Sequence, residues 1–339
     1  MEIKENVDLY PFNTFRLHAT ARQMVTITSS DEARMVFKSE LFRRNKHFIL
    51  GGGSNILLTQ DYDGLVVKNE IRGIEVVYED DATVRLRVGA GENWHQLVMY
   101  CVDHDFGGIE NLSLIPGTAG AAPMQNIGAY GVEVREVIHN VEAIDVRSAS
   151  TRVFSRDECE FGYRESIFKQ SLKDQYFISS ITLSLTKKNH RYNTSYGAIS
   201  DVLKQNNVET PSVKAISDAV IAIRSSKLPD PNAIGNAGSF FKNPSVEHSL
   251  YERLKEHHPD IPSFPGENNL VKIPAAWLIE KCGWKGKTID SIGVHKNQAL
   301  VLVNYGDGKG KDIWKLATDI QQSVQQKFGI LLHPEVNVI

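Results

Sequence analysis

The sequence feature that most constrains the fold is a stretch of small residues at positions 115–131, IPGTAGAAPMQNIGAYG. It holds four glycines, four alanines and two prolines in 17 residues. Glycine and proline disfavour a regular helix, and the stretch is too apolar for a solvated linker. A backbone pressed closely against a flat ligand explains this composition, with Gln125 and Asn126 reading heteroatoms of that ligand. The alternative is a buried irregular crossover.

A second small-residue loop, Gly51-Gly52-Gly53-Ser54-Asn55, follows a short apolar stretch at 48–50. Three glycines without Cβ atoms leave the backbone N–H groups open, so the loop can wrap a phosphate, with Ser54 and Asn55 as further donors. The alternative is a tight turn between two strands. The chain contains no G-x-G-x-x-G fingerprint, so the usual signature of a dinucleotide-binding Rossmann unit is absent.

The composition narrows the class of protein. The chain has 339 residues, 41% hydrophobic and 23% charged, which is enough for roughly two domains. It has no apolar run near the ~18 residues of a membrane span, and its start, MEIKENVDLY, lacks the apolar core of a secretory signal. A net charge of -3 does not favour a broad nucleic-acid surface, and three scattered cysteines favour free thiols over disulfides or a metal site. We therefore expect a cytoplasmic protein with no nucleic acid, membrane, metal or obligate protein partner.

Hydrophobic spacing predicts an α+β protein. Helices are predicted over residues 31–44 with Ser30 as N-cap, 92–106, 213–226 with Ser212 as N-cap, 274–283 and 312–328. Strands are predicted at 48–50, 65–67, 74–78, 83–88, 299–303 and 330–332, and the stretch 137–185 is predicted to be rich in strands. The last helix and the strands on either side of it form a predicted βαβ unit. The segment LPDPNAIGNAG at 228–238 indicates a hinge, so we place the main domain boundary near residue 226.

Three further segments carry side chains suited to chemistry. GNAGSFFKNP presents Ser239 between a small-residue loop and two phenylalanines, FGYRES places Arg164 after an aromatic turn, and HPEV places Glu335 near the end of the sequence. A nucleophilic serine needs a neighbouring base, and no base stands at a suitable spacing, so a role other than nucleophile is indicated for Ser239. The alternative for each segment is a structural loop or charge.

In their order along the chain, GGGSN, PGTAGAAPMQNIGAYG, FGYRES, LPDPNAIGNAGSFFKNP, GWKG and HPEV resemble the UDP-N-acetylenolpyruvylglucosamine reductase family. The resemblance covers nearly the whole chain and implies an enzyme of peptidoglycan precursor synthesis, a UDP-N-acetylmuramate dehydrogenase. It implies an FAD-binding region of the p-cresol methylhydroxylase type over residues 1–225, with α+β lobes at about 1–72 and 73–225. A separate α+β substrate-binding domain would cover 226–330, and a C-terminal segment at 331–339 would carry Glu335.

The resemblance also assigns residues to the site. The catalytic residues would be Arg164, Ser239 and Glu335. FAD would be held by the two small-residue loops and one strand residue, namely Gly51, Gly52, Gly53, Ser54, Asn55, Ile115, Pro116, Gly117, Thr118, Gly120, Ala121, Gln125, Asn126, Ile127, Gly128, Ala129 and Ile178. The substrate would be held by Tyr130, Tyr196, Lys227, Asn243, Lys285 and Gln298. Ser54 and Asn55 follow the glycines where some distant relatives attach FAD to a histidine, so non-covalent FAD is expected. Tyr196 belongs to a tyrosine loop, His190–Ile199, that only one branch of the family has.

The family's reaction turns an enolpyruvyl ether into a lactyl ether, with FAD as cofactor and NADPH as reductant. The resemblance implies hydride delivery to the vinyl carbon, protonation of C2 by Ser239, and stabilisation of the enolate by Arg164 and Glu335. An ionised Glu335 would repel the substrate carboxylate, so we expect it to be protonated or to hydrogen-bond as an acid. Two alternatives are an FAD-dependent oxidase of the same superfamily and a non-enzymatic nucleotide-binding regulator. GNAGSFFKNP argues against the first, and the second would not need all three catalytic residues.

Overall fold

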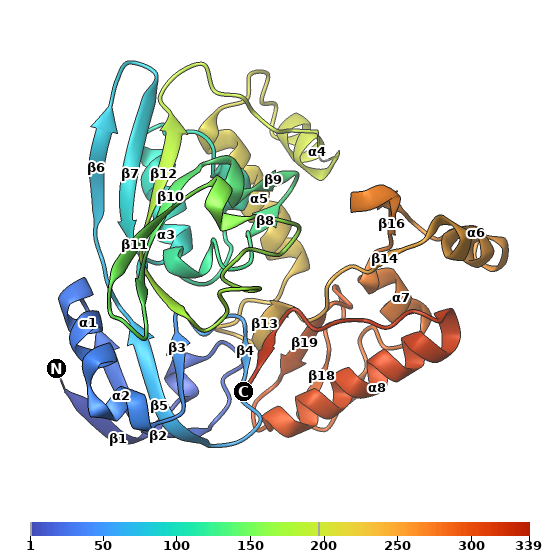
Figure 1. Ribbon diagram of the computed structural model, residues 1–339. Helices are drawn as coiled ribbons and strands as arrows, with labels where there is room; N and C mark the ends of the chain where they lie inside the picture. The colour runs from blue at the N-terminus through green and yellow to red at the C-terminus, as the bar shows by residue number, and fades with distance from the viewer. Residues whose placement is uncertain (1, 196) are drawn as a thin grey trace. The chain divides into compact units, whose positions relative to one another are not determined.

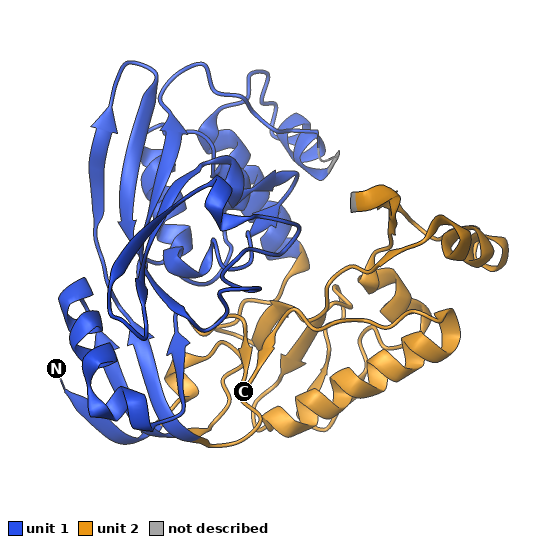
Figure 2. Cartoon of the chain, in the orientation of Figure 1, with its two compact units in different colours: residues 1–7, 21–52, 63–226 blue, residues 8–20, 53–62, 227–339 orange. Residues whose placement is uncertain are grey.

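The computed structural model describes residues 2–195 and 197–339, which form two compact units (Figure 2). The first unit comprises Met1–Val7, Ala21–Gly52 and Asp63–Ser226, and the second comprises Asp8–Thr20, Gly53–Tyr62 and Lys227–Ile339. The second unit therefore includes two early segments, Asp8–Thr20 and Gly53–Tyr62, that were predicted to belong to the FAD-binding region. The domain boundaries given above stay a prediction, whereas the mixed helix and strand content confirms the α+β class (Figure 1).

The first unit contains a four-stranded sheet in the order β1-β2-β5-β3, in which β3 and β5 run parallel. Two short helices pack on it through a core that includes Val36, Phe37, Phe42 and Leu65. The elements are β1 (Ile3–Asp8), β2 (Thr20–Ile27), α1 (Ser30–Lys38), α2 (Glu40–Arg44), β3 (His47–Leu50) and β5 (Tyr62–Asn69), and the 3₁₀ helix η1 (Tyr10–Phe12) between β1 and β2 belongs to the second unit.

The helix predicted over 31–44 is wrong as a single helix, because Ser39 breaks it. The backbone of Ser39 is extended, its hydroxyl donates to the carbonyl of Val36 at 2.6 Å, and it accepts from the N–H of Phe42 at 3.2 Å. Serine competes with the helical backbone in this way, ending one helix and capping the next. Ser29, rather than Ser30, is the N-cap of α1, and its hydroxyl accepts from the N–H of Glu32.

A five-stranded antiparallel sheet forms the larger part of the first unit, in the order β11-β10-β12-β7-β6. The helix predicted at 92–106 is present as α3, and its apolar face, including Trp94 and Leu97, packs on this sheet. The predicted Ser212 cap is also confirmed, since its hydroxyl accepts from the N–H of Ala215 at 3.1 Å. The elements are β6 (Ile74–Glu79), β7 (Thr83–Gly89), α3 (Trp94–Asp103), η2 (Glu110–Leu112), η3 (Ala119–Ala121), β8 (Gly128–Ala129), β9 (Val132–Glu133), η4 (Val134–Glu136), β10 (Ile138–Asp145), β11 (Thr151–Ser155), η5 (Asp157–Cys159), β12 (Tyr176–Thr186), α4 (Gly197–Gln205) and α5 (Val213–Lys227).

The second unit is built on a four-stranded sheet in the order β13-β19-β18-β17, against which α7 and α8 bury apolar side chains. A three-stranded sheet (β14-β16-β15) and a parallel pair (β20-β4) complete it. The elements are β4 (Ile56–Leu57), β13 (Gly235–Ser239), β14 (Ser245–Val246), α6 (His248–His257), β15 (Phe264–Pro265), η6 (Glu267–Asn269), β16 (Val271–Lys272), α7 (Ala275–Lys281), β17 (Thr288–Ile289), β18 (Ile292–Val294), β19 (Val301–Asn304), α8 (Gly310–Phe328) and β20 (Asn337–Val338).

The predicted strand at 330–332, and with it the predicted βαβ unit, is wrong. Ile330 and Leu332 are buried in the core of the second unit, but the segment has irregular backbone. The strand before α8, β19, pairs only with antiparallel neighbours among the described residues. The apolar run at 330–332 therefore indicates burial, but it does not form a strand paired in a sheet.

Among the described residues, no helix combines the length and the apolar character needed to cross a membrane. The three cysteines are free thiols, and Cys101 and Cys159 are buried. Over the described chain, no cluster of three or more His, Cys, Asp or Glu side chains is placed to hold a metal ion.

Candidate active site

The two small-residue loops contact each other within the first unit. A Cβ atom added to Gly51 would lie 2.8 Å from Oγ1 of Thr118, and one added to Gly52 would lie 2.9 Å from Cα of Gly117. The second of these atoms belongs to backbone and cannot move aside easily. The loops therefore approach so closely that position 52 requires glycine.

The loop around Gly117–Ala121 is hydrogen-bonded to the turn between β7 and α3. The carbonyls of Ala90 and Glu92 accept from the N–H groups of Gly120 and Ala119 at 2.9 and 2.8 Å, and the N–H of Trp94 donates to the carbonyl of Gly117 at 3.0 Å. A Cβ on Gly120 would lie 2.5 Å from that of Ala90. A loop of small residues exposes its backbone N–H groups, and the hydrogen bonds to the β7–α3 turn fix its position. Such a loop fits a flat cofactor that carries phosphates.

Asn126 is fully buried, and its side chain is engaged by the protein. Its amide donates to Oε2 of Glu133 and to the carbonyl of Gly162 at 3.0 and 2.9 Å, and its oxygen accepts from the N–H of Arg135 at 3.2 Å. The side chain thus makes hydrogen bonds within the protein, and its predicted role in reading ligand heteroatoms stays a prediction. Its place is underneath the loop, where it fixes a left-handed backbone turn with φ of 44°.

Arg164 lies against the same loop. Its guanidinium donates to the carbonyl of Gly128 at 2.5 Å and to that of Asn126 at 3.4 Å, and it sits 5.4 Å from the ring centre of Tyr163. The first unit thus brings the predicted catalytic arginine together with the predicted cofactor loop. These two hydrogen bonds hold the planar group against the backbone carbonyls of the loop.

Tyr130 is bound through its backbone to the segment that precedes Tyr196. The side-chain amide of Asn111 donates to the carbonyls of both Tyr130 and Asn193, at 3.1 and 2.9 Å. Asn193 in turn donates to the carbonyl of Gly131 at 2.9 Å. Tyr196 itself lies outside the described residues, so its predicted role is not tested by the structure.

Arg224 on α5 is a charged neighbour of this region that no sequence motif had indicated. Burial lowers the pKa of its guanidinium, while Tyr130 raises it by hydrogen bonding and charge and Arg164 lowers it. Its Nε donates to the carbonyl of Leu114 at 3.3 Å. A sequence signal was present, because Arg224 follows Val220 by four residues and so falls on the inward face of the predicted helix.

In the second unit, Ser239 and Glu335 are held on adjoining backbone. Ser239 ends β13 after an irregularity in its pairing with β19, and its side chain is exposed. The next residue, Phe240, donates its N–H to the carbonyl of Leu300 at 2.8 Å and accepts from the N–H of Glu335 at 2.8 Å. The N–H of Lys242 also donates to the carbonyl of His333 at 2.9 Å, so the segments carrying these two predicted catalytic residues, far apart in sequence, are paired along their backbones.

The GGGSN loop is divided between the units. Gly53 has φ of 65°, and a Cβ there would lie 1.9 Å from the carbonyl oxygen of Phe12. The amide of Asn55 donates to the carbonyl of Glu335 at 3.3 Å, and the carbonyl of Asn55 accepts from the N–H of Asn337 at 3.0 Å. Asn55 thus supports the segment that carries Glu335, a role that the sequence did not reveal.

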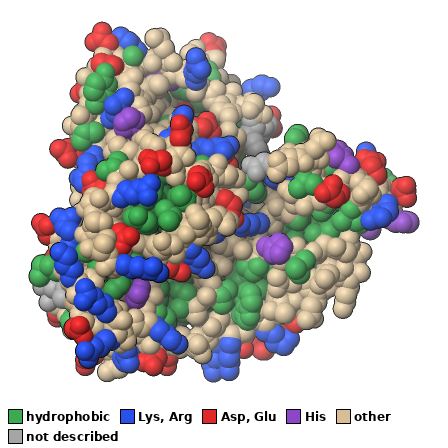
Figure 3. Space-filling view, viewed as in Figure 1, with side chains coloured by type: hydrophobic (Ala, Val, Ile, Leu, Met, Phe, Trp, Pro, Cys, Tyr) green, Lys and Arg blue, Asp and Glu red, His purple; other side chains and the backbone are tan. Residues whose placement is uncertain are grey.

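The predicted substrate residues of the second unit occupy separate positions. Lys227 ends α5 and is exposed. Asn243 accepts from the N–H of Ala275 at 2.9 Å and so caps α7, Lys285 pairs with Glu280 at 3.0 Å, and Gln298 accepts from the N–H of Leu300 at 3.3 Å. On the face shown in Figure 3, basic side chains are interspersed with acidic ones.

Comparison with known proteins first gives the class. Residues 21–153 match the family described as an FAD binding domain. This range contains both loops as far as Gly131, together with the turn that supports them. The chain is therefore a flavoprotein with FAD as its cofactor.

The match over residues 230–339 is to the family described as UDP-N-acetylenolpyruvoylglucosamine reductase, C-terminal domain. Proteins named UDP-N-acetylenolpyruvoylglucosamine reductase from Flavobacterium johnsoniae and Amoebophilus asiaticus are 48% and 49% identical to the chain, each over 100% of both sequences. The crystal structure of UDP-N-acetylenolpyruvylglucosamine reductase from Thermus caldophilus has the same fold, with a TM-score of 0.69 at 21% identity, covering 100% of this chain and 99% of that one.

The chain belongs to the UDP-N-acetylenolpyruvoylglucosamine reductase family. The resemblance noted in the sequence is confirmed, and the chain is an FAD-dependent oxidoreductase. This assignment excludes the non-enzymatic regulator and decides against the oxidase.

Proposed function

We propose that the protein reduces UDP-N-acetylenolpyruvoylglucosamine to UDP-N-acetylmuramate at the expense of NADPH, in cytoplasmic synthesis of peptidoglycan precursors. The names of full-length relatives support the substrate. The single observation that carries the proposal is the backbone hydrogen bond between Glu335 and Phe240, which is adjacent to Ser239. This hydrogen bond keeps the backbone of Glu335 next to that of Ser239, although the two residues are far apart in sequence. Their proximity supports a shared chemical role.

When bound, FAD supplies hydride transfer, from NADPH in the first half-reaction and to the vinyl carbon of the substrate in the second. Negative charge then develops on C2 and on the adjoining carboxylate. Arg164 can present two parallel N–H donors to that carboxylate, a geometry that only a guanidinium offers. Its support from the carbonyls of Asn126 and Gly128 favours a fixed orientation, which is the condition for effective stabilisation of developing charge.

Ser239 is proposed to donate the proton that C2 receives. A serine hydroxyl is a weak acid, but an enolate carbon is a strong base, so the transfer does not require a histidine partner. Glu335 is proposed to hydrogen-bond the carboxylate as an acid, since two ionised carboxylates would repel each other. The exposure of the Ser239 side chain at the end of β13 is compatible with this role.

The remaining assignments follow the family resemblance. Lys227 and Lys285 would bind the diphosphate, and Tyr130, Tyr196, Asn243 and Gln298 would complete the substrate site. The two loops and Ile178 would bind FAD without a covalent bond. For Asn243 and Gln298 the substrate role is proposed in addition to the backbone contacts they already make.

Anaerobic mixing tests the proposal. NADPH should bleach the visible absorbance of the bound flavin, and the enolpyruvyl sugar nucleotide added afterwards should restore it with formation of the lactyl ether. Air should restore the absorbance slowly by comparison. Rapid reoxidation by air and none by the sugar nucleotide would contradict the proposal and favour an oxidase.

A further inference from the structure

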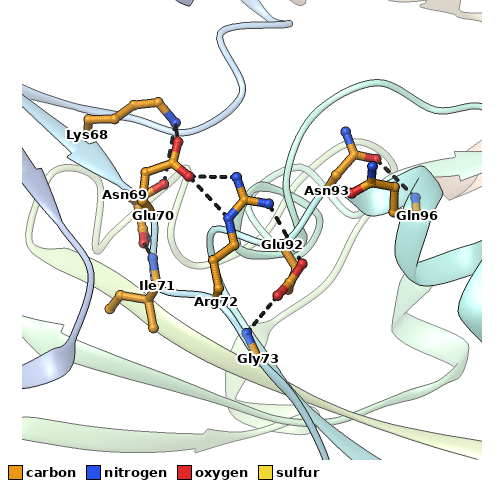
Figure 4. A network of polar contacts seen from close by, with 9 residues as sticks. All are labelled: Lys68, Asn69, Glu70, Ile71, Arg72, Gly73, Glu92, Asn93 and Gln96. Atoms are coloured by element: carbon orange, nitrogen blue, oxygen red, sulfur yellow. Dashed lines mark hydrogen bonds and ion pairs between the residues drawn. The ribbon is translucent and has the colours of Figure 1, made fainter.

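A connected group of charged side chains lies in the first unit, apart from the residues assigned above (Figure 4). Lys68 and Glu70 form an ion pair, and Arg72 joins Glu70 at 2.6 Å and Glu92 at 3.7 Å. Glu92 also accepts from the N–H of Gly73 at 2.6 Å. The side chain of Lys68 is only 9% exposed, that of Glu92 18% and that of Glu70 28%. We call Lys68, Glu70, Arg72 and Glu92 the charged cluster.

One end of the charged cluster adjoins the first cofactor loop. Lys68 is the register partner of Leu50 in the parallel pair of β5 and β3, and Leu50 directly precedes Gly51. The following residue, Asn69, donates to the carbonyl of Ile178 at 2.9 Å, and Ile178 is the strand residue proposed to contact FAD. The position of Lys68 is therefore tied to the strand end from which the glycine loop starts.

The other end of the charged cluster supports the second cofactor loop. The carbonyl of Glu92 accepts from the N–H of Ala119, while its carboxylate is held by Arg72 and Gly73. Glu92 thus joins the loop, through its backbone, to the charges, through its side chain. The cluster spans from the base of the Gly51 loop to the base of the Gly117–Ala121 loop.

In the charged cluster, the ionised form of Glu70 is stabilised by its two cationic neighbours, Lys68 and Arg72. Burial alone would raise the pKa of the Glu70 carboxyl, but hydrogen bonds from Lys68 and Arg72 hold it below its usual range. Glu70 is thereby kept ionised between two cations. Exposed ion pairs contribute little, whereas removal of one partner from a buried pair leaves an uncompensated charge and is costly. The buried Lys68 end is therefore the sensitive part.

We propose that the charged cluster is a positioning device for FAD, in which Glu70 and Arg72 set the spacing of the two cofactor loops. None of the four side chains needs to touch the cofactor, because they act through the backbone of Leu50 and of Ala119. The inference rests on FAD binding by these loops, and it adds four positioning residues that the loop motifs do not contain.

The test uses FAD release from the holoenzyme, followed by the rise in flavin fluorescence on serial dilution. Glu70→Gln keeps the shape of the side chain and removes its charge. It should weaken FAD binding about tenfold, the change that ~1.4 kcal/mol produces in an equilibrium constant. Arg72→Gln should act in the same direction, and Arg72→Lys should recover part of the affinity. The Arg72 pair is half-exposed and keeps the test available even where Glu70→Gln does not fold.

The matched control is Glu79→Gln. Glu79 pairs with Lys187 in the same unit, at 2.5 Å, but on β6 and away from both loops. It should leave FAD affinity unchanged. An affinity of Glu70→Gln and Arg72→Gln equal to that of the control would overturn the proposal. So would a loss of resistance to urea in the flavin-free chain without a change in FAD affinity. Failure of the parent protein to hold any FAD would instead contradict the flavin assignment itself.

Discussion

The two units form their parts of the predicted site in different ways. In the first unit the loops around Gly51 and Gly117 are backbone packed on backbone, with polar side chains such as Asn126 turned inward as supports. In the second unit the backbone around Phe240 is paired, and Ser239 carries an exposed side chain. A surface that binds a flat cofactor needs the removal of side chains, whereas a proton donor needs one side chain held in place. The difference indicates that mutations in the first unit should affect cofactor affinity, and mutations in the second should affect turnover.

Arg164 is the exception that can break this comparison, since it belongs to the first unit but is proposed to act on substrate. Arg164→Lys retains the charge and loses the planar fork. Turnover should fall about 10²–10³-fold, the typical cost of one stabilising donor, with flavin content unchanged. Steady-state kinetics and the flavin absorbance of the purified variant check this. Loss of flavin with normal turnover of the remaining holoenzyme would make Arg164 a support of the loop.

Gly52→Ala tests the backbone packing of the first unit. Its Cβ would lie 2.9 Å from Cα of Gly117, so one loop must move. An inserted methyl group typically costs ~1–3 kcal/mol, or roughly 5- to 150-fold in FAD affinity if the whole cost falls on binding. Equilibrium dilution of the holoenzyme measures it. The control is Gly162→Ala, whose Cβ would have Glu165 at an ordinary 3.6 Å. Equal FAD affinities of the two variants would show that the loops can accommodate a Cβ atom at position 52.

Asn243→Ala should have the smallest effect, and it sharpens the comparison within the second unit. Loss of the hydrogen bond to the N–H of Ala275 should lower the free energy of unfolding by about 0.5–1.5 kcal/mol. Asn243→Asp keeps the acceptor oxygen and should restore stability, as urea unfolding can show. A raised KM for the sugar nucleotide in the stable Asp variant would support substrate binding by the amide nitrogen. An unchanged KM would leave Asn243 only as a helix cap.

The sequence predicted the helices that have both a clear apolar face and a recognisable end. α3 and α5 are examples, because Trp94 and Leu97 share one face and Ser212 caps the other helix. It failed at Ser39, where a hydroxyl that serves two helices divides a continuous apolar pattern. It also failed at 330–332, where buried residues form no ladder. Local patterns report burial but not the hydrogen-bond partners that distant segments supply.

The same limit applies to the site. The motifs drew attention to Ser239, Arg164 and Glu335, and the family resemblance implied their roles, but neither showed that the N–H of Glu335 donates to the carbonyl of Phe240. The motifs also could not show that the side-chain amide of Asn126 donates hydrogen bonds within the protein. Arg224 was missed because no motif surrounds it, although its place on an inward helix face was a signal. Long-range contacts decide which polar side chains remain available to a ligand.

The most direct measurement of the central claim is rapid-mixing absorbance of the bound flavin in Ser239→Ala, with each half-reaction followed separately. NADPH should bleach the flavin of this variant at the parent rate, because the serine has no part in that step. Reoxidation by the enolpyruvyl sugar nucleotide should be slowed by about 10²–10⁴-fold, the usual cost of a lost general acid, and Ser239→Cys should recover much of the rate. Reoxidation within about tenfold of the parent, a difference of only ~1.4 kcal/mol in barrier, or a defect in the NADPH step, would contradict the account.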